Sequence, residues 1–365
     1  MGSGNLYGCL SFWARRWPNR VAICCPDSVV TWGELEVASN RIGANLYGRG
    51  ISRGGAVGIL MSNRAEFAEV MFGTFRAGAA LVLLNVRYTA REMVHPVLDS
   101  GLRLIVTEEK FLPQLKEVRE TVADLEVYVV DAPEGERHLK DLKSANVSPP
   151  DVAVSADDIA LICYTSGTTG VPKGAILSHG NIFSAAAAKA FAMGQNFNDR
   201  ALMPLPLAFT GGAVGLLRDG VIPGSTIYLI PASDPGAFLE LIEREKITSV
   251  ACVPVFYEQM LAHRNFGNTD FSSLRYVVAG GGVPSLHLLK SWQKRGVALV
   301  QGYGLTEAAG SYCTILFDED AERKLGCAGR VLPNVDMKLL TEDGRTARTG
   351  EVGEILIRGP IVTRG

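Results

Sequence analysis

A chain of 365 residues exceeds the usual size of one hydrophobic core, so we expect two or three subdomains. Hydrophobic residues make up 47% of the chain, charged residues 20%, and the formal net charge is -2. This composition is typical of a globular protein and argues against a nucleic-acid partner, and no apolar run approaches the ~20 residues of a membrane span.

The 7 Cys and 5 His residues argue against a metal or disulfide framework. The cysteines are scattered without CxxC spacing, and the histidines do not cluster with them. The N-terminus also lacks the pattern of a signal peptide. We therefore expect a protein of the reducing cytoplasm.

Helical and extended patterns alternate along most of the chain. A helix is predicted to open at Thr31, because its apolar residues recur near the helical period at Leu35, Ala38, Ile42 and Leu46. Further helices are predicted at 66–76, 181–193, 235–246 and 284–295. Strands are predicted at 57–60, 79–84, 102–107, 125–130, 159–164, 226–230, 249–253, 276–279 and 297–301.

This alternation predicts an α/β fold with parallel sheets covered by helices on both faces. The polar stretch 144–158 is interpreted as a linker, which divides a first α/β subdomain (1–150) from a second one (151–325). After Gly329 the pattern changes, and two strand-like runs flank Glu342-Asp343-Gly344, a hairpin signal. We expect two doubly wound α/β subdomains followed by a partial small antiparallel β subdomain (326–365).

The strongest local signal is a loop rich in glycine and hydroxyl residues between Tyr164 and Gly174. Glycines let backbone N–H groups converge on an anion, while hydroxyl groups and a Lys add donors and charge, as a triphosphate requires. The loop is not a Walker loop, because Gly174 follows Lys173 and a strand pattern continues. The alternative is a hairpin loop that binds nothing. The residues predicted to contact phosphate are Thr165, Ser166, Gly167, Thr168, Thr169, Gly170 and Lys173.

This loop is similar to the signature loop of the superfamily of AMP-forming acyl-CoA synthetases, peptide-synthetase adenylation domains and luciferases. The resemblance spans nearly the whole chain, because four further segments follow the family's order: 77–89, 301–307, 326–333 and 350–359. It implies that ATP, with Mg²⁺, activates a small carboxylic acid as an acyl adenylate and that CoA then takes the acyl group.

The resemblance assigns further ATP contacts to two segments that follow predicted strands. The carboxyl ends of such strands are where open α/β sheets place ligands. Tyr303 is expected to stack on adenine, Thr306 to bind phosphate oxygen and Glu307 to bind Mg²⁺. The alternatives are a core aromatic for Tyr303 and a surface acid for Glu307. The other expected ATP contacts are Gly280, Gly281, Gly282, Gln301, Gly302 and Gly304.

The segment 204–212 corresponds to one that bears on the acyl group in the family. Phe209 stands where many acyl-CoA synthetases carry His, and no Asp occurs between Pro204 and Leu217 to hold an amino acid's ammonium group. We therefore expect an uncharged aliphatic or aromatic acid, although Phe209 is alternatively only core packing. The expected substrate contacts are Phe209, Thr210, Gly211, Gly212 and Gly302.

The resemblance thus implies catalytic roles for Lys173, Thr306 and Glu307. In the family the chain continues beyond the equivalent of Gly365, with a ribose-binding Asp, a hinge and a mobile domain that carries a catalytic Lys. We expect residues 1–365 to be the large N-terminal domain, incomplete for full catalysis. Two alternatives stay open: transfer of the acyl group to a carrier-protein thiol, and a non-catalytic nucleotide-binding fragment.

Overall fold

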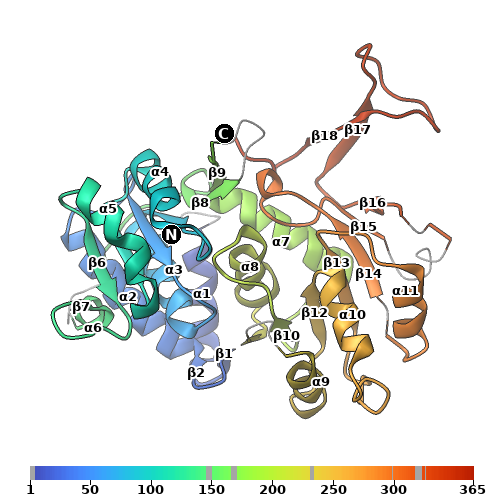
Figure 1. The fold of residues 1–365 in the computed structure, drawn as a ribbon, viewed down its shortest axis with the longest axis horizontal. Helices are drawn as coiled ribbons and strands as arrows, with labels where there is room; N and C mark the ends of the chain where they lie inside the picture. The colour runs from blue at the N-terminus through green and yellow to red at the C-terminus, as the bar shows by residue number, and fades with distance from the viewer. Residues whose placement is uncertain are drawn as a thin grey trace.

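The protein is described from a computed structural model that covers residues 5–144, 150–165, 171–230, 234–297, 299–316, 323–324 and 326–365. Within these residues, the β structure consists of two large sheets and one two-stranded sheet (Figure 1). The two large sheets are mostly parallel and are flanked by helices, as the alternation of patterns predicted.

The first sheet has seven strands, and only its last pair, β8 and β9, is antiparallel. These two strands form the hairpin whose loop is the glycine- and hydroxyl-rich segment. The strand order is β7 (Arg137–His138), β6 (Glu126–Val129), β5 (Leu104–Thr107), β3 (Ala56–Leu60), β4 (Ala80–Leu83), β8 (Ile159–Thr165) and β9 (Lys173–Ser178).

The second sheet has nine strands with a parallel centre and antiparallel edges. The strand order is β16 (Arg330–Val331), β15 (Thr314–Leu316), β14 (Leu299–Tyr303), β13 (Tyr276–Gly280), β12 (Ser249–Cys252), β10 (Arg200–Met203), β11 (Thr226–Leu229), β1 (Val21–Cys24) and β2 (Val29–Thr31). The predicted hairpin near the end of the chain is β17 (Asp336–Leu340) with β18 (Glu354–Arg358), which projects from the body of the molecule in Figure 1.

The helices complete a layered arrangement, because each central strand buries both faces. In β3, Val57 and Ile59 join a core that also contains helices α1, α2, α3 and α7, whereas Ala56 and Leu60 join a separate core under α4. The helices are α1 (Leu6–Arg16), α2 (Trp32–Gly48), α3 (Ala65–Ala77), α4 (Ala90–Ser100), α5 (Lys116–Thr121), α6 (Leu139–Lys143), α7 (His179–Met193), α8 (Thr210–Gly215), α9 (Pro235–Arg244), α10 (Pro254–Ala262) and α11 (Leu286–Gln293). Short turns of other helical types are η1 (Glu109–Leu115), η2 (Leu216–Val221) and η3 (Thr306–Ala308).

Local sequence signals explain where several helices begin. Thr31 caps α2, where its hydroxyl accepts the N–H of Glu34 and the carboxylate of Glu34 accepts the N–H of Thr31. Thr89 and Glu92 form the same reciprocal cap at α4. Ser178 caps α7 immediately after β9, so the second strand of the hairpin leads directly into a helix that packs between the sheets.

Strand pairing crosses the predicted subdomain boundary at residue 150 in both directions. Strands β1 and β2 precede this boundary but extend the second sheet, while β8 and β9 follow it but extend the first. The pairings that cross the boundary, β1 with β11 and β4 with β8, are both parallel, and they join strands far apart in the chain, which a local pattern does not specify. The division into 1–150, 151–325 and 326–365 stays a prediction about domains, but the sheets do not follow it.

Candidate active site

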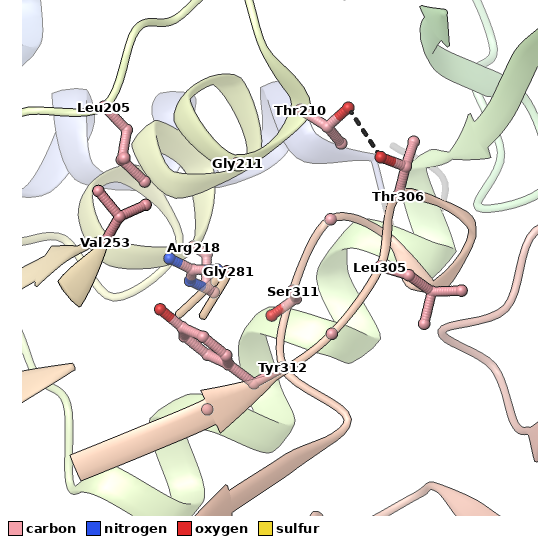
Figure 2. Close-up of a pocket in the computed structure, with 13 residues that line it drawn as sticks. Leu205, Thr210, Gly211, Arg218, Val253, Gly281, Leu305, Thr306, Ser311 and Tyr312 are labelled. Atoms are coloured by element: carbon pink, nitrogen blue, oxygen red, sulfur yellow. Dashed lines mark hydrogen bonds between the residues drawn. The ribbon is translucent and has the colours of Figure 1, made fainter. Parts of the chain in front are cut away.

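A cavity of about 300 Å³ lies at the carboxyl ends of β13 and β14, next to the start of α8 (Figure 2). Open parallel sheets bind ligands at this edge. Residues from both predicted ATP segments and from the predicted substrate segment meet here. The cavity is lined by Leu205, Thr210, Gly211, Arg218, Val253, Gly281, Gly302, Gly304, Leu305, Thr306, Gly310, Ser311 and Tyr312.

Two of the predicted glycines are required by close packing at this cavity. A Cβ atom on Gly302 would lie 2.3 Å from the Tyr312 ring, and one on Gly304 would lie 1.7 Å from the carbonyl oxygen of Ser311. Gly281 has φ of +74°, a conformation that other residues rarely adopt. The glycines thus let the backbone at the ends of β13 and β14 pass close to its neighbours beside the cavity.

Thr306 joins this cavity to a second one of about 560 Å³, because its side chain lines both. The Thr306 hydroxyl lies 3.4 Å from the hydroxyl of Thr210, which also lines both cavities. The neighbouring Glu307 is exposed, and its backbone carbonyl accepts the N–H of Thr363 at 2.8 Å. A backbone hydrogen bond from Thr363 therefore anchors the turn η3 beside the junction of the two cavities.

The base of the predicted phosphate loop forms part of the second cavity. Thr165 and Pro172 line this cavity, and Lys173 pairs with Thr165 at the loop end of the β8–β9 hairpin. The hairpin rests on α4, where the Tyr164 hydroxyl donates to Asp99 at 2.7 Å. Burial, and then Asp99, raise the pKa of Tyr164. Residues 166–170 of the loop lie outside the described residues.

Phe209 does not line the 300 Å³ cavity. Its ring lines the second cavity and a third one of about 850 Å³, and the guanidinium of Arg87 lies 5.7 Å from the ring centre. Gly211 lines all three cavities, and Gly212 lines the third. Phe209 therefore stands between two neighbouring spaces and is half-buried.

A buried charged cluster lies beside the 300 Å³ cavity, which Arg218 lines, and the predicted site residues do not include any of its members. Arg218 and Asp219 lie on η2, Lys189 lies on α7, and all three side chains are at most 4% exposed. Asp219 accepts hydrogen bonds from Lys189 at 2.5 Å and from Arg218 at 2.6 Å. The available signal was a charged pair inside the apolar run that follows Gly215.

The charges of this cluster shift one another's protonation. Burial lowers the pKa of Lys189 to about 8, although Asp219 opposes the shift. Burial acts to raise the pKa of Asp219, but Arg218 and Lys189 outweigh it and hold that pKa well below its ordinary value. When Lys189 is protonated, the cluster contains two cations and one carboxylate, as the ion pairs of Lys189 and Arg218 with Asp219 require.

Comparison with known proteins assigns the chain to a family. A family model described as AMP-binding enzyme matches residues 10–365. The chain belongs to the family of AMP-binding enzymes.

Several named relatives of this AMP-binding enzyme are CoA ligases. The chain is 35% identical over 354 residues to a feruloyl-CoA synthase of an Amycolatopsis species, covering 96% of this chain and 69% of that protein. It is 32% identical over 338 residues to the long-chain-fatty-acid–CoA ligase FadD13 of Mycobacterium tuberculosis, covering 93% of this chain and 66% of that protein.

Solved structures of related proteins share the fold. The N-terminal domain of FACL13 from Mycobacterium tuberculosis superimposes with a TM-score of 0.91 at 30% identity, covering 99% of this chain and 90% of that chain. The o-succinylbenzoate coenzyme A synthetase of Bacillus subtilis, in complex with ATP and magnesium ion, gives a TM-score of 0.85 at 29% identity, covering 98% of this chain and 71% of that chain.

Among the described residues, no helix is both long and apolar enough to cross a membrane.

The remaining predicted ATP contacts of the AMP-binding enzyme lie around the same edge of the second sheet. Gly280 ends β13, and Tyr303 ends β14 as a half-buried side chain. Gln301 is buried, and its side-chain oxygen has no hydrogen-bond partner in the part of the chain that is described. None of these residues, nor Gly282, lines one of the three cavities, so their contacts with ATP stay predictions.

The chemistry of Glu307 fits a magnesium ion that ATP brings with it. Within the described ranges, no group of three or more His, Cys, Asp or Glu side chains could hold a metal by itself. Mg²⁺ needs no such group when phosphates and water supply most of its ligands, because one carboxylate then suffices. Glu307 offers an exposed carboxylate directly after Thr306, which lines the cavity beside the loop base.

Proposed function

We propose that this AMP-binding enzyme uses ATP to convert a small carboxylic acid into an acyl adenylate, and then transfers the acyl group to CoA. The observation that carries this proposal is that Thr165, Thr306 and Thr210 line one cavity, although they come from three distant segments. Two of these residues also line the neighbouring cavity, which is large enough for a small acid. A triphosphate and an acid bound in these two spaces would meet at Thr306 and Thr210.

In the first step, a carboxylate oxygen of the acid attacks the α-phosphorus of ATP. A new P–O bond forms, the bond to the β-phosphate oxygen breaks, and its electron pair leaves with pyrophosphate. The protein's contribution is to position the two substrates and to stabilise developing charge. We assign the β- and γ-phosphates to the loop from Thr165 to Lys173 and adenine to Gly280–Gly282 with Tyr303. The Mg²⁺ held at Glu307 would neutralise phosphate charge.

In the second step, the thiol sulfur of CoA attacks the acyl carbonyl, a thioester forms, and AMP leaves. Relatives named as CoA ligases support CoA as the acceptor. A carrier-protein thiol would undergo the same chemistry and is the second candidate. We further propose a cytosolic enzyme, which is supported by seven cysteines without the spacing of a disulfide framework.

The test is acid-dependent exchange of labelled pyrophosphate into ATP by the full-length protein, with a panel of aliphatic and aromatic acids. Exchange that requires an acid and Mg²⁺ supports adenylation, and CoA or a purified carrier protein is then added to identify the acceptor. ATP binding without exchange for any acid would contradict the proposal and favour a non-catalytic nucleotide-binding protein.

A further inference from the structure

One buried cation faces the 300 Å³ cavity without a complete set of partners. Arg218 is 2% exposed to solvent and lines this cavity together with Tyr312. Figure 2 shows its guanidinium beside the Tyr312 ring, away from the Thr210–Thr306 pair at which the reacting carboxylate is expected. Arg218 therefore lies where the tail of a bound acid would end.

Only part of the hydrogen-bonding capacity of Arg218 is used. A guanidinium has five N–H donors, and Nε and Nη2 each donate to Asp219, at 3.1 and 2.6 Å. The remaining donors have no hydrogen-bond partner among the residues that the structure describes. Arg218 lines the cavity, so an anionic acceptor bound there could take these remaining donors in a charge-assisted hydrogen bond.

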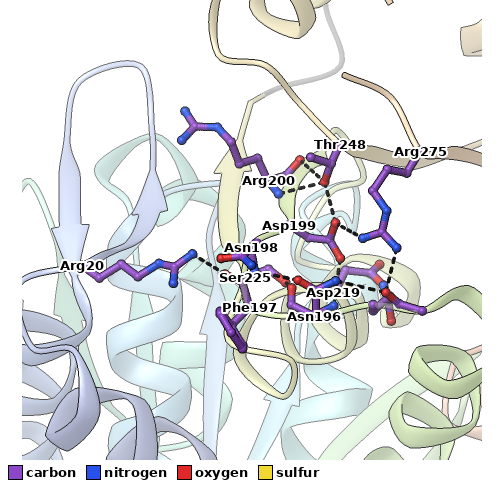
Figure 3. Close-up of polar contacts among 12 residues, drawn as sticks. Arg20, Asn196, Phe197, Asn198, Asp199, Arg200, Asp219, Ser225, Thr248 and Arg275 are labelled. Carbon is purple, nitrogen blue, oxygen red and sulfur yellow. Dashed lines mark hydrogen bonds and ion pairs between the residues drawn. The ribbon is translucent and has the colours of Figure 1, made fainter. Parts of the chain in front are cut away.

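The cluster around Arg218 also carries a surplus positive charge. Lys189 and Arg218 share the single carboxylate of Asp219. The nearby carboxylate of Asp199 does not offset this surplus, because Arg275 donates to it at 2.6 Å (Figure 3). The surplus is partly stabilised by an aromatic face, since the guanidinium of Arg218 lies 4.9 Å from the centre of the Tyr312 ring.

The backbone around this cation is closely packed. Arg218 lies in η2, a π-helical turn, and such turns frequently occur at functional sites. Glycines on either side allow the turn to pack closely: a Cβ on Gly215 would lie 2.6 Å from Met203, and one on Gly220 would lie 2.4 Å from Ile227. A preorganised guanidinium favours planar recognition of a carboxylate.

We propose that Arg218 determines substrate specificity by binding an anionic oxygen group, a second carboxylate, at the far end of the acid's tail. This inference rests on the proposed function and names its substrate class. It replaces the expectation of an uncharged acid, which rested on residues 204–217 and left a charged partner near Arg218 or Asp219 as the alternative. A distal carboxylate would accept the unused N–H groups and balance the surplus charge.

The experiment compares linear dicarboxylic acids of increasing length with the monocarboxylic acids of the same chain length. Binding of each acid is measured by calorimetry in the presence of AMP, and kcat/KM by pyrophosphate exchange. At the length that reaches Arg218, we expect the diacid to be preferred by roughly 10- to 100-fold. This ratio corresponds to the free energy of one charge-assisted hydrogen bond.

Variants separate direct contact from a general effect on folding. Arg218→Gln keeps polar donors but removes the charge, and it leaves Lys189 and Asp219 as a balanced pair, so the fold should persist. Its ratio of diacid to monoacid kcat/KM should fall to about one. Arg200→Gln is the matched control, because Arg200 is paired with Glu245 outside the cavity and the change should leave the ratio unaltered.

Two results would overturn the inference. One is equal or better binding of the monoacids by the wild-type protein at every chain length. The other is a diacid preference that Arg218→Gln leaves intact. Failure of the proposed function would give a different result, because no acid would then support pyrophosphate exchange. The calorimetric comparison of diacids with monoacids would still test the role of Arg218.

Discussion

Acid should destabilise this protein through one buried imidazole, His179. Its side chain is fully buried at the first turn of α7, where Nδ1 accepts the N–H of Leu6 at 3.3 Å and the ring packs edge-on against Phe75. Burial lowers the pKa of His179 from 6.5 to about 4, and Asp158 opposes this shift only partly. The helix N-terminus also disfavours a positive charge at this position.

The sign and size of the effect follow from proton linkage. Below pH 6.5 the unfolded chain binds a proton at this His that the folded protein takes up only near pH 4, so stability falls as the pH falls through this window. The full loss is about 3 kcal/mol at or below pH 4, and about 2 kcal/mol is already lost at pH 5. Well above pH 6.5, where His179 is neutral in both states, its contribution to the free energy of unfolding no longer changes with pH.

The assay is urea unfolding followed by tryptophan fluorescence at a series of pH values between 7.5 and 4.5. His179→Gln should be less stable than the wild type at neutral pH but should lose about 2 kcal/mol less on acidification to pH 5. His287→Gln, on the exposed side of α11, is the matched control and should keep the wild-type pH profile. Equal acid dependence of the wild type and His179→Gln would refute the reasoning.

Three further substitutions test the site. Lys173→Ala should weaken ATP binding or adenylation by about 1.5–3 kcal/mol with an unchanged melting temperature, because one charge-assisted contact is lost; unchanged nucleotide affinity and exchange would remove Lys173 from the site. Glu307→Gln should abolish most Mg²⁺-dependent exchange, while the stability of the nucleotide-free protein stays nearly constant. A lower melting temperature with unchanged exchange would instead make Glu307 a structural acid. Gly302→Ala should lower the free energy of unfolding by about 1–3 kcal/mol and raise the KM for the acid, because the new Cβ displaces the Tyr312 ring that lines the cavity. A fully active and equally stable variant would contradict the close packing of Gly302 against Tyr312.

Local sequence patterns determined the elements around the site and their order. The strand, loop and strand around Thr165 and Lys173 appear as the hairpin β8–β9, because a period of two and glycine-rich turns act within a few residues. The segment at 301–307 lies at the carboxyl end of β14 for the same reason. The helix predicted from Thr31 begins there because its cap is made by Glu34, three residues away.

Tertiary structure alone decided which sheet each strand joins and which side chains share a cavity. Strand β1 pairs with β11, some 200 residues later in the chain, and β8 pairs with β4 across the predicted boundary. Each of these strands has an apolar pattern that would satisfy either sheet, so the choice depends on the packing of whole layers. The meeting of Thr165 with Thr306 follows from that choice.

The buried charged cluster of Lys189, Arg218 and Asp219 also depends on the tertiary structure. In the sequence, Arg218 and Asp219 are an isolated charged pair in an apolar run, and a pair of this kind is as compatible with a solvated surface as with a core. Burial of η2 against α7 brings Lys189 to the same carboxylate and turns Arg218 toward the cavity. The residue types were visible in the sequence, but their desolvation and their surplus charge exist only once distant helices pack together.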